Sequence, residues 1–450
     1  MNMKTPFWMV GILLLHLGRI AQAEVVRLEA QSRSDAPFAI PTFHCLGLYW
    51  SPPGGATNRE VQVRYRRQGA SEWKEALPMR YNPIPMTEED LADYRGSIVH
   101  LAPTTAYEVQ LTLTGTSTTT NLTAATWRED FPAGQTVRVG NGDAPLTINE
   151  SGTPNAYRVY DGRGATIDVR HEHDSCITIN ASNVVLRGFT LKGAGASNST
   201  LKRPIGAIQI ESGQDILIEG CDISDWGRLN PATNFGRDYD AAIYSRNVWD
   251  NYITQCMNMI GNAPASIGPL YIWRNAVARS QSQPEAGGMN FLKMGYADGE
   301  DWMTSQMYIF HNTLFRADEW LPTGALGGNR IVKHTVSRNN ILHVRTPQGY
   351  SASENKQNAD NDFDYDLFNG RIPNGHEAHG VRGEPVYAAN SGFDAALKTG
   401  RFQLAPDSPG AGAGLAIPNF SDGYRGRAPD IGAHQRGAPP MQYGVAANQP

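Results

Sequence analysis

The stretch Phe310-His311-Asn312-Thr313-Leu314 belongs to a short pattern in which two β-rich runs flank one polar or small residue. The pattern returns six times, as LRGFTL at 186–191, IEGCDI at 218–223, WDNYI at 249–253, WRNAV at 273–277, FHNTL at 310–314 and RNNIL at 338–342. Between equivalent central residues the steps are 32, 30, 24, 37 and 28 residues. An irregular period averaging about 30 residues is typical of stacked coils with loop insertions.

Each return predicts a strand, a corner and a second strand. Four returns place an asparagine at the corner: Asn251, Asn275, Asn312 and Asn340. An asparagine can adopt the left-handed backbone conformation, and its amide can hydrogen-bond to the asparagine of the next coil, about 4.8 Å away. The sequence therefore predicts an all-β chain built on a right-handed parallel β-helix. A propeller or sandwich array is the alternative, but propeller blades need roughly 40 residues with four strands each.

Residues 1–23 have the composition of a secretory signal peptide. Lys4 precedes an apolar run from Phe7 to Leu15, and Ala21-Gln22-Ala23 provides a small-residue cleavage site. We therefore expect a secreted protein, extracellular or periplasmic. No later stretch approaches the ~18 uninterrupted apolar residues of a membrane span, so no membrane insertion is expected.

The charge and cysteine content restrict the class of partner. The formal net charge of −5 provides no basic surface for nucleic acid, so none is expected as a partner. An acidic ligand would need a local cluster of arginine and lysine. The four cysteines show no Cys-x-x-Cys spacing, so no zinc site is predicted. Cys221 and Cys256 lie in successive coils, as two buried thiols or as a disulfide.

Residues 24–127 show strands of alternating polarity separated by turn signals, with Trp50 and Tyr65 among the expected core residues. The pattern Leu-x-Pro-x-Thr-x-Tyr at 101–107 resembles that of fibronectin type III domains, in which Tyr107 would form a tyrosine corner. The resemblance implies a β-sandwich without chemistry of its own, acting as a spacer or as a weak binding platform.

Residues 128–170 are expected to form a linker and an N-terminal cap, because the open end of a β-helix exposes unpaired strands. The stretch DGRGATID at 161–168 and the closing stretches LAPDSPGAG at 404–412 and DIGAH at 430–434 resemble those of secreted bacterial parallel β-helix polysaccharidases. The resemblance implies a polysaccharide lyase-like β-helix with a C-terminal cap over 171–436, followed by a flexible tail at 437–450. It identifies a superfamily and not a substrate.

A β-helix presents a long outer sheet on which side chains of successive coils line up as a groove. Before one groove strand, a long loop carries Arg237, Asp238 and Tyr239, which we predict to bind substrate. In the strand itself, alternation puts Asp240 and Tyr244 on one face and Ile243 on the other, toward the core. Arg246 follows at the corner.

The second candidate region is the insertion that produces the 37-residue step. It carries Asn290 and Lys293 on opposite faces of a predicted strand, so a bulge or the strand's end must redirect one of them into the groove. Asn290 is predicted to bind substrate, and Trp226 and Trp302 are candidates for stacking on sugar rings. His311, beside a corner asparagine, is expected to face solvent.

These residues suit β-elimination on a uronic-acid polymer. A base removes the proton beside the carboxylate while a cation neutralises that carboxylate. We predict Lys293 as the base, Arg246 as the neutralising cation and Tyr244 as the proton donor, with Asp240 as a further catalytic residue. The same groups without chain cleavage would make a uronate epimerase. The expected partner is an acidic polysaccharide.

Two other functions stay open. A glycoside hydrolase needs paired carboxylates, about 5 Å apart for retention or roughly 6.5–9.5 Å for inversion, and Asp238 and Asp240 with Glu285 or Asp318 are candidates. The other is a non-catalytic protein that only binds glycan. Calcium is the only metal considered, because residues 360–366 are acidic, although they lack the glycine and glutamate of an EF-hand loop.

Overall fold

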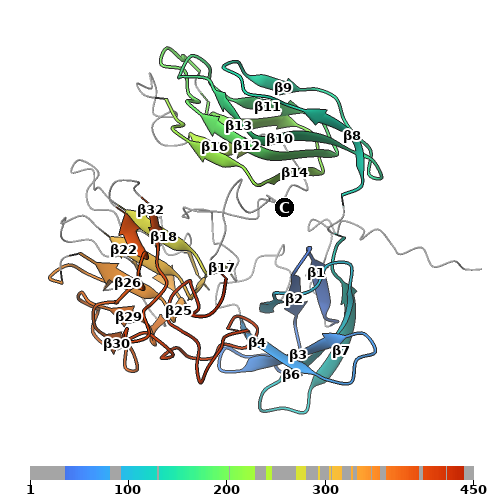
Figure 1. Ribbon diagram of the computed structural model, residues 1–450. Helices are drawn as coiled ribbons and strands as arrows, with labels where there is room; N and C mark the ends of the chain where they lie inside the picture. The colour runs from blue at the N-terminus through green and yellow to red at the C-terminus, as the bar shows by residue number, and fades with distance from the viewer. Residues whose placement is uncertain are drawn as a thin grey trace, which may run out of the picture.

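In the computed structural model, the described part of the chain folds into β-structure (Figure 1). The structure describes residues 36–81, 93–128, 131–201, 203–228, 240–245, 270–279, 292–293, 304–305, 307–316, 326–327, 332–345, 347–354, 361–394, 399–421 and 423–439. Every regular element in these ranges is a strand, which confirms the all-β prediction. Over the same ranges, no helix suited to crossing a membrane is found.

The N-terminal strands form one antiparallel sheet of seven, which we call sheet I. Its spatial order is β1 (Phe38–Pro41), β2 (Leu46–Trp50), β5 (Tyr94–Ile98), β4 (Lys74–Tyr81), β3 (Glu60–Arg67), β6 (Ala106–Leu113) and β7 (Thr119–Ala125). The alternation along β3 buries Val61, Val63 and Tyr65, as the sequence predicts. The Tyr107 hydroxyl accepts a hydrogen bond of 2.9 Å from the Ala102 amide, which ties the start of β6 to the preceding turn.

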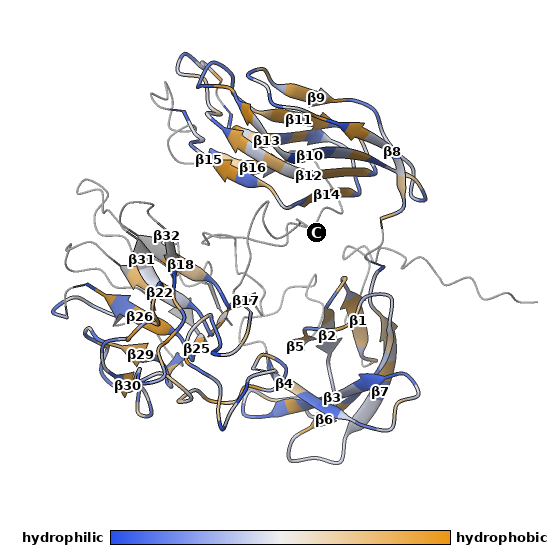
Figure 2. Cartoon of the chain, viewed as in Figure 1, coloured by the Kyte–Doolittle hydropathy of each residue, from blue (hydrophilic) through white to orange (hydrophobic). Residues whose placement is uncertain are grey.

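A first stack of parallel strands follows, in two sheets. Sheet II contains β8 (Ala133–Arg138), β10 (Tyr157–Asp168), β12 (Val184–Lys192), β14 (Ile216–Glu219) and β15 (Asp222–Ser224), and sheet III contains β9 (Leu146–Ile148), β11 (Ile177–Asn180), β13 (Gly206–Ser212) and β16 (Ala241–Ser245). Arg187 pairs with Glu219 and Thr190 with Asp222, so the predicted step of 32 residues is confirmed. Figure 2 shows apolar and polar residues interspersed along these strands. The segment 128–170, expected as a linker and cap, already contributes β8, β9 and β10 to the stack.

The second stack contains three parallel sheets. Sheet IV holds β17 (Leu270–Trp273), β21 (Met307–Phe310), β25 (Val336–Arg338) and β28 (Asp362–Phe363), sheet V holds β18 (Ala276–Arg279), β22 (Thr313–Arg316), β26 (Ile341–Val344), β29 (Leu367–Phe368) and β30 (Val381–Arg382), and sheet VI holds β19 (Leu292–Lys293), β23 (Leu326–Gly327) and β27 (Ala352–Ser353). Short pairs are formed by β20 (Thr304–Ser305) with β24 (Val332–Lys333) and by β31 (Gly392–Asp394) with β32 (Thr399–Arg401). Thr313 pairs with Ala276 and with Ile341, which confirms the steps of 37 and 28 residues. The two stacks are those of a parallel β-solenoid.

The corner asparagines of the second stack form a continuous hydrogen-bonded ladder. The Asn275 amide donates to Asn312 at 3.0 Å, Asn312 donates to Asn340 at 2.9 Å, and Asn340 donates to Asp366 at 3.0 Å. The predicted contact between asparagines of successive coils is therefore confirmed, and Asp366 ends the ladder.

The left-handed backbone conformation lies one residue before each ladder asparagine, where the prediction had placed it on the asparagine itself. Arg274, His311 and Asn339 have φ of 55°, 52° and 58°. The turn thus bends at the residue before each ladder asparagine. The side-chain amide of the asparagine itself donates to the equivalent residue of the next coil. The prediction that His311 faces solvent is wrong: its side chain is 1% exposed, and its Nε2 lies 2.8 Å from the Ser421 hydroxyl, because the C-terminal segment covers the corner.

Sheet I packs against the outer face of sheet IV. Tyr308 and Phe310 of sheet IV share a buried cluster with Val99, and Phe420 from the C-terminal segment stacks at 5.2 Å on Tyr271. The Asn419 side chain donates to the Val99 carbonyl and accepts from the Val99 amide, both at 2.6 Å. The N-terminal region is therefore packed against the second stack.

The outer face of sheet V is covered as well. Ile341 and Leu367 of this sheet pack in one buried cluster with Leu404 and Ile431 of the C-terminal segment. Phe315 contacts Phe402 with ring centroids 5.7 Å apart. Over the described part of the chain, none of the buried hydrophobic clusters lies over the outer face of sheet VI. Of the three outer faces of the second stack, two are thus occupied by the protein itself.

The end of the asparagine ladder predicts a pH-dependent stability. Asp366 is buried and Glu377 beside it is half-buried. The Asp366 amide donates to Glu377 at 3.0 Å, and desolvation followed by repulsion from Asp366 raises the pKa of Glu377. Burial likewise raises the pKa of Asp366 despite its bonds from Ser337 and Asn340. A carboxyl group whose pKa is raised by folding contributes to stability when the pH is below the ordinary carboxyl pKa. This contribution to the free energy of unfolding is lost as the pH rises through the pKa of the folded state.

We therefore expect the free energy of unfolding to fall between about pH 5 and pH 8, and Glu377→Gln to remove much of that slope and to stabilise the protein at pH 8 by at least about 1 kcal/mol. Urea unfolding at several pH values measures both. Glu75→Gln, at an exposed position of β4, is the matched control and should leave the profile unchanged. A variant profile as steep as that of the unmodified protein would contradict the assignment.

Candidate functional site

The predicted site residues are divided between described and undescribed parts of the chain. Asp240, Tyr244 and Trp226 are described, and Lys293 is described as part of strand β19. The others lie outside the described residues: Arg237, Asp238, Tyr239, Arg246, Asn290 and Trp302, together with the hydrolase candidates Glu285 and Asp318.

Tyr244 lies on a line of polar residues that crosses sheet III. It pairs with Gln209, which pairs with Thr178, which pairs with Thr147. On the opposite face of β16, Ile243 packs against the core, so the predicted alternation is confirmed. Because neighbouring strands are about 4.8 Å apart, the line places one polar side chain on each coil, and within it Gln209 is 2% exposed.

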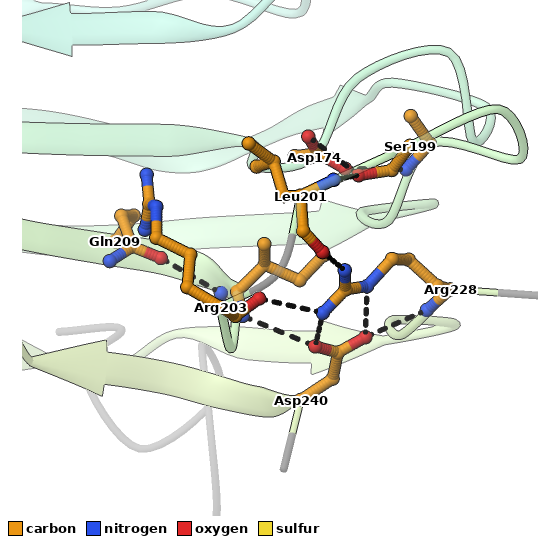
Figure 3. Close-up of polar contacts among 10 residues, drawn as sticks. Asp174, Ser199, Leu201, Arg203, Gln209, Arg228 and Asp240 are labelled. Carbon is orange, nitrogen blue, oxygen red and sulfur yellow. Dashed lines mark hydrogen bonds and ion pairs between the residues drawn. The ribbon is translucent and has the colours of Figure 1, made fainter. Parts of the chain in front are cut away.

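Asp240, just before β16, forms a buried ion pair with Arg228 (Figure 3). The two side chains are 4% and 2% exposed. One Asp240 oxygen accepts from Arg228 Nη2 at 2.6 Å, and the other accepts from Arg228 Nε at 2.9 Å. Hydrogen bonding to Asp240 raises the pKa of Arg228, so the guanidinium stays charged. This two-point contact is the strongest geometry available to an arginine and a carboxylate.

The same pair gathers three segments of the chain. Arg228 donates to the carbonyls of Leu201 at 2.7 Å and Arg203 at 2.9 Å, and Asp240 accepts from the Ile205 amide at 3.2 Å. We call Arg228, Asp240 and the two carbonyls the clasp. Its bonds occupy both oxygens of Asp240 and tie this residue into the fold, and the catalytic role predicted for Asp240 stays a prediction. Arg228 was not singled out from the sequence, because an arginine in a loop carries no signal of what it will contact.

Lys293 lies in sheet VI, next to a position that faces the core. Its neighbour Leu292 pairs with Leu326, which pairs with Ala352, and both of these partners are 0% exposed. In the same register, Lys293 pairs with Gly327, which pairs with Ser353.

Sheets III and VI both come before a corner strand, but at different places in the coil. In the first stack, β13 of sheet III is followed directly by β14 and the corner at Gly220; in the second, β23 of sheet VI is followed by the short strand β24 and only then by β25 and the corner at Asn339. Lys293, on β19, is likewise separated from the corner strand β21 by β20. The outer faces of sheets IV and V are covered by other parts of the chain.

A small cleft lies elsewhere, between sheet I and sheet IV. It has a volume of about 170 Å³ and is lined by Arg80, Arg338, Tyr308 and the C-terminal segment at 415–418. Arg80 is paired with Glu60 and Arg338 with Asp362. Since both cations are already neutralised, this cleft has less to offer an acidic ligand than the outer faces of sheets III and VI.

Neither a metal cluster nor a disulfide is evident at the positions considered. Among the described residues, no group of three or more histidine, cysteine or acidic side chains is arranged to hold a metal ion. In the acidic stretch considered for calcium, Asp362 pairs with Arg338, Asp364 with His379 and Asp366 with Ser337. Cys221 is a free thiol whose burial raises its pKa to about 11, and Cys256 lies outside the described residues.

Comparison with known proteins adds no family: no protein-family model matches the chain, and no curated protein is similar to it.

Proposed function

We propose that this chain is a secreted enzyme that binds an acidic polysaccharide along sheets III and VI and cleaves it by β-elimination. One observation carries the proposal. The chain covers the outer faces of sheets IV and V with its own residues, whereas in sheet III Tyr244 continues a line of polar residues through Gln209, Thr178 and Thr147. One polar group per coil along a sheet suits a polymer substrate, and Lys293 on sheet VI would supply the base.

Two finer structural assignments belong to the same proposal. The coils wind right-handed, because parallel strands joined by a crossover almost always do so. Sheet I is a fibronectin type III-like sandwich: its strand order returns to bring β1 near β7, and the Tyr107 hydroxyl bonds to the turn at Ala102 as in a tyrosine corner. Residues 1–23 serve as the secretion signal.

In the proposed reaction, the neutral amine of Lys293 takes the proton from the carbon that bears the uronate carboxylate. Arg246 neutralises that carboxylate, which stabilises the negative charge that develops. The electron pair of the broken C–H bond forms a carbon–carbon double bond, and the bond to the glycosidic oxygen breaks. Tyr244 gives its proton to the departing oxygen. The products are one unsaturated and one ordinary chain end.

Hydrolysis is the second candidate, and the clasp makes it weaker. Asp240 is 4% exposed and bonded through both oxygens, so a hydrolase would have to use Asp238 with Glu285 or Asp318. Epimerisation would use the same residues as the lyase up to the carbanion. A protein that binds glycan without reaction would need only the face of sheet III.

The test is ultraviolet absorbance of the new double bond while the mature protein is incubated with a panel of uronic-acid polymers, with and without chelator. We expect absorbance to rise, and Lys293→Ala to lower the rate by at least about a hundredfold, as for loss of a general base. Lys74→Ala, at an exposed position of sheet I, is the control and should keep full activity. A rise that survives Lys293→Ala would remove the base assignment alone. New reducing ends without absorbance would replace the lyase by a hydrolase.

A further inference from the structure

Two of the three exposed large hydrophobic side chains in the described part of the chain belong to loops joined by the clasp. Trp226 is 41% exposed and Leu201 is 36% exposed; the third, Val386, lies in the C-terminal segment. Trp226 stands two residues before Arg228, and the Leu201 carbonyl accepts from Arg228 Nη1. A buried ion pair thus holds two loops that each present an apolar side chain to solvent.

The turn that carries Trp226 is fixed on both sides. Asp225 and Gly227 have φ of 50° and 104°, both in the region that favours glycine. The Gly227 amide donates to the Ala194 carbonyl at 2.9 Å, and the Arg228 amide donates to Asp240 at 3.1 Å. An exposed tryptophan on an immobilised turn contributes little to the core, and its backbone is already ordered for contact with a ligand.

Beside these loops, two buried donors lack acceptors among the described residues. Gln209 is 2% exposed, its Oε1 accepts from the Gly206 amide at 3.1 Å, and its Nε2 has no partner. Arg203 donates through Nη2 to Glu211 at 2.7 Å, while its Nη1 has no partner. Figure 3 shows both residues with the clasp. Unsatisfied buried donors are rare and need an explanation, which an ordered water, an ion or a ligand can provide.

We propose that the loops gathered by the clasp form a subsite for one uronate unit of the substrate, with Trp226 as the apolar platform and Gln209 and Arg203 as donors to its oxygens. The proposal rests on the proposed function. A uronate has an apolar ring face, which matches the Trp226 platform. It also has a carboxylate, which matches the neutral donor Gln209 and the charged donor Arg203. The Arg203 side chain is 35% exposed, so it can turn toward a bound carboxylate.

In this arrangement Asp240 is a positioning residue. It holds Arg228, and Arg228 holds the backbone of the Trp226 turn and of the Leu201–Arg203 loop. The subsite lies along the same sheet as Tyr244, since Gln209 and Tyr244 are register partners. A sugar unit bound at Gln209 would therefore be one coil away from the proposed proton donor.

The experiment measures binding by calorimetry with oligogalacturonate, oligomannuronate and hyaluronan oligosaccharides, and with cellohexaose as the neutral probe. We expect at least one acidic probe to bind more tightly than cellohexaose. Trp226→Ala should weaken that binding by about tenfold. Gln209→Glu keeps the acceptor for the Gly206 amide but replaces the Nε2 donor by a carboxylate oxygen that would face the ligand oxygen. This variant should bind the acidic probes more than about tenfold more weakly. Val386→Ala, the exposed hydrophobic residue away from the clasp, should bind as the unmodified protein does.

Urea unfolding of each variant separates binding from structure. Gln209→Glu with unchanged stability and lost acidic binding supports the subsite, whereas lost stability with unchanged binding assigns Gln209 to the fold and overturns it. If Trp226→Ala and Gln209→Glu both bind as the unmodified protein does, the subsite is overturned while the absorbance assay still decides the lyase proposal. If cellohexaose binds as tightly as every acidic probe, or if no probe binds, the uronate assignment is overturned.

Discussion

Replacing Asp240 by alanine is expected to lower the free energy of unfolding by about 3–5 kcal/mol, because it leaves the Arg228 guanidinium buried without a counter-charge. The guanidinium side chain is 2% exposed, so water cannot replace the carboxylate. Urea unfolding followed by circular dichroism measures the change. This loss would show that Asp240 serves the fold, whereas a reacting carboxylate could be removed with loss of activity and little loss of stability.

The matched control is Glu211→Ala, which breaks the Arg203–Glu211 pair in the neighbouring loop. Those side chains are 35% and 23% exposed, so we expect a cost of less than about 1 kcal/mol. The double variant Arg228→Met with Asp240→Leu should recover part of the loss, because it removes both charges together. An Asp240→Ala protein as stable as the Glu211→Ala protein would exclude the clasp as a structural element.

The second large effect is expected at the asparagine ladder. Asn340 is 0% exposed, accepts from the Asn312 amide at 2.8 Å and side chain at 2.9 Å, and donates to the Ile309 carbonyl at 2.8 Å. Asn340→Ala removes these partners at once and leaves buried donors on the neighbouring coil without acceptors. We expect a loss of about 3 kcal/mol or more in the free energy of unfolding, since each unsatisfied buried group costs about 1–3 kcal/mol.

An asparagine contact at the surface provides the comparison. Asn180 is exposed and donates to Asn149 at 3.0 Å across two coils of the first stack. Asn180→Ala should cost less than about 1 kcal/mol, because water satisfies the groups it leaves. Equal losses in the two variants, measured by the same urea titration, would mean that the ladder adds nothing beyond an ordinary surface contact.

Much of the β-solenoid could be predicted because its coils repeat. Equivalent residues of neighbouring coils pair directly, so a recurring pattern contains its own register, as the pairing of Thr313 with Ile341 confirms. The outward position of Tyr244 and the inward position of Ile243 followed from alternation in the same way. Local rules of this kind need no knowledge of distant contacts.

The same rules failed where distant segments meet. His311 was expected in solvent because its own coil leaves it outside, but the segment that covers it lies about one hundred residues later and bonds through Ser421. Arg228 gave no sign of its partner Asp240, since the loop between them has no repeat to align. Which outer faces are covered depends on contacts such as that of Asn419 with Val99, 320 residues away in the chain.

The sequence by itself determined the β-solenoid class, the register of its coils and the contact between corner asparagines, because these depend on periodicity and on residues one coil apart. Only the tertiary structure decided that sheets IV and V are covered, that Asp240 is held in a clasp and that Trp226 stands exposed on a fixed turn. Those features depend on which segments far apart in the chain come together, and that is set by the packing of the whole core.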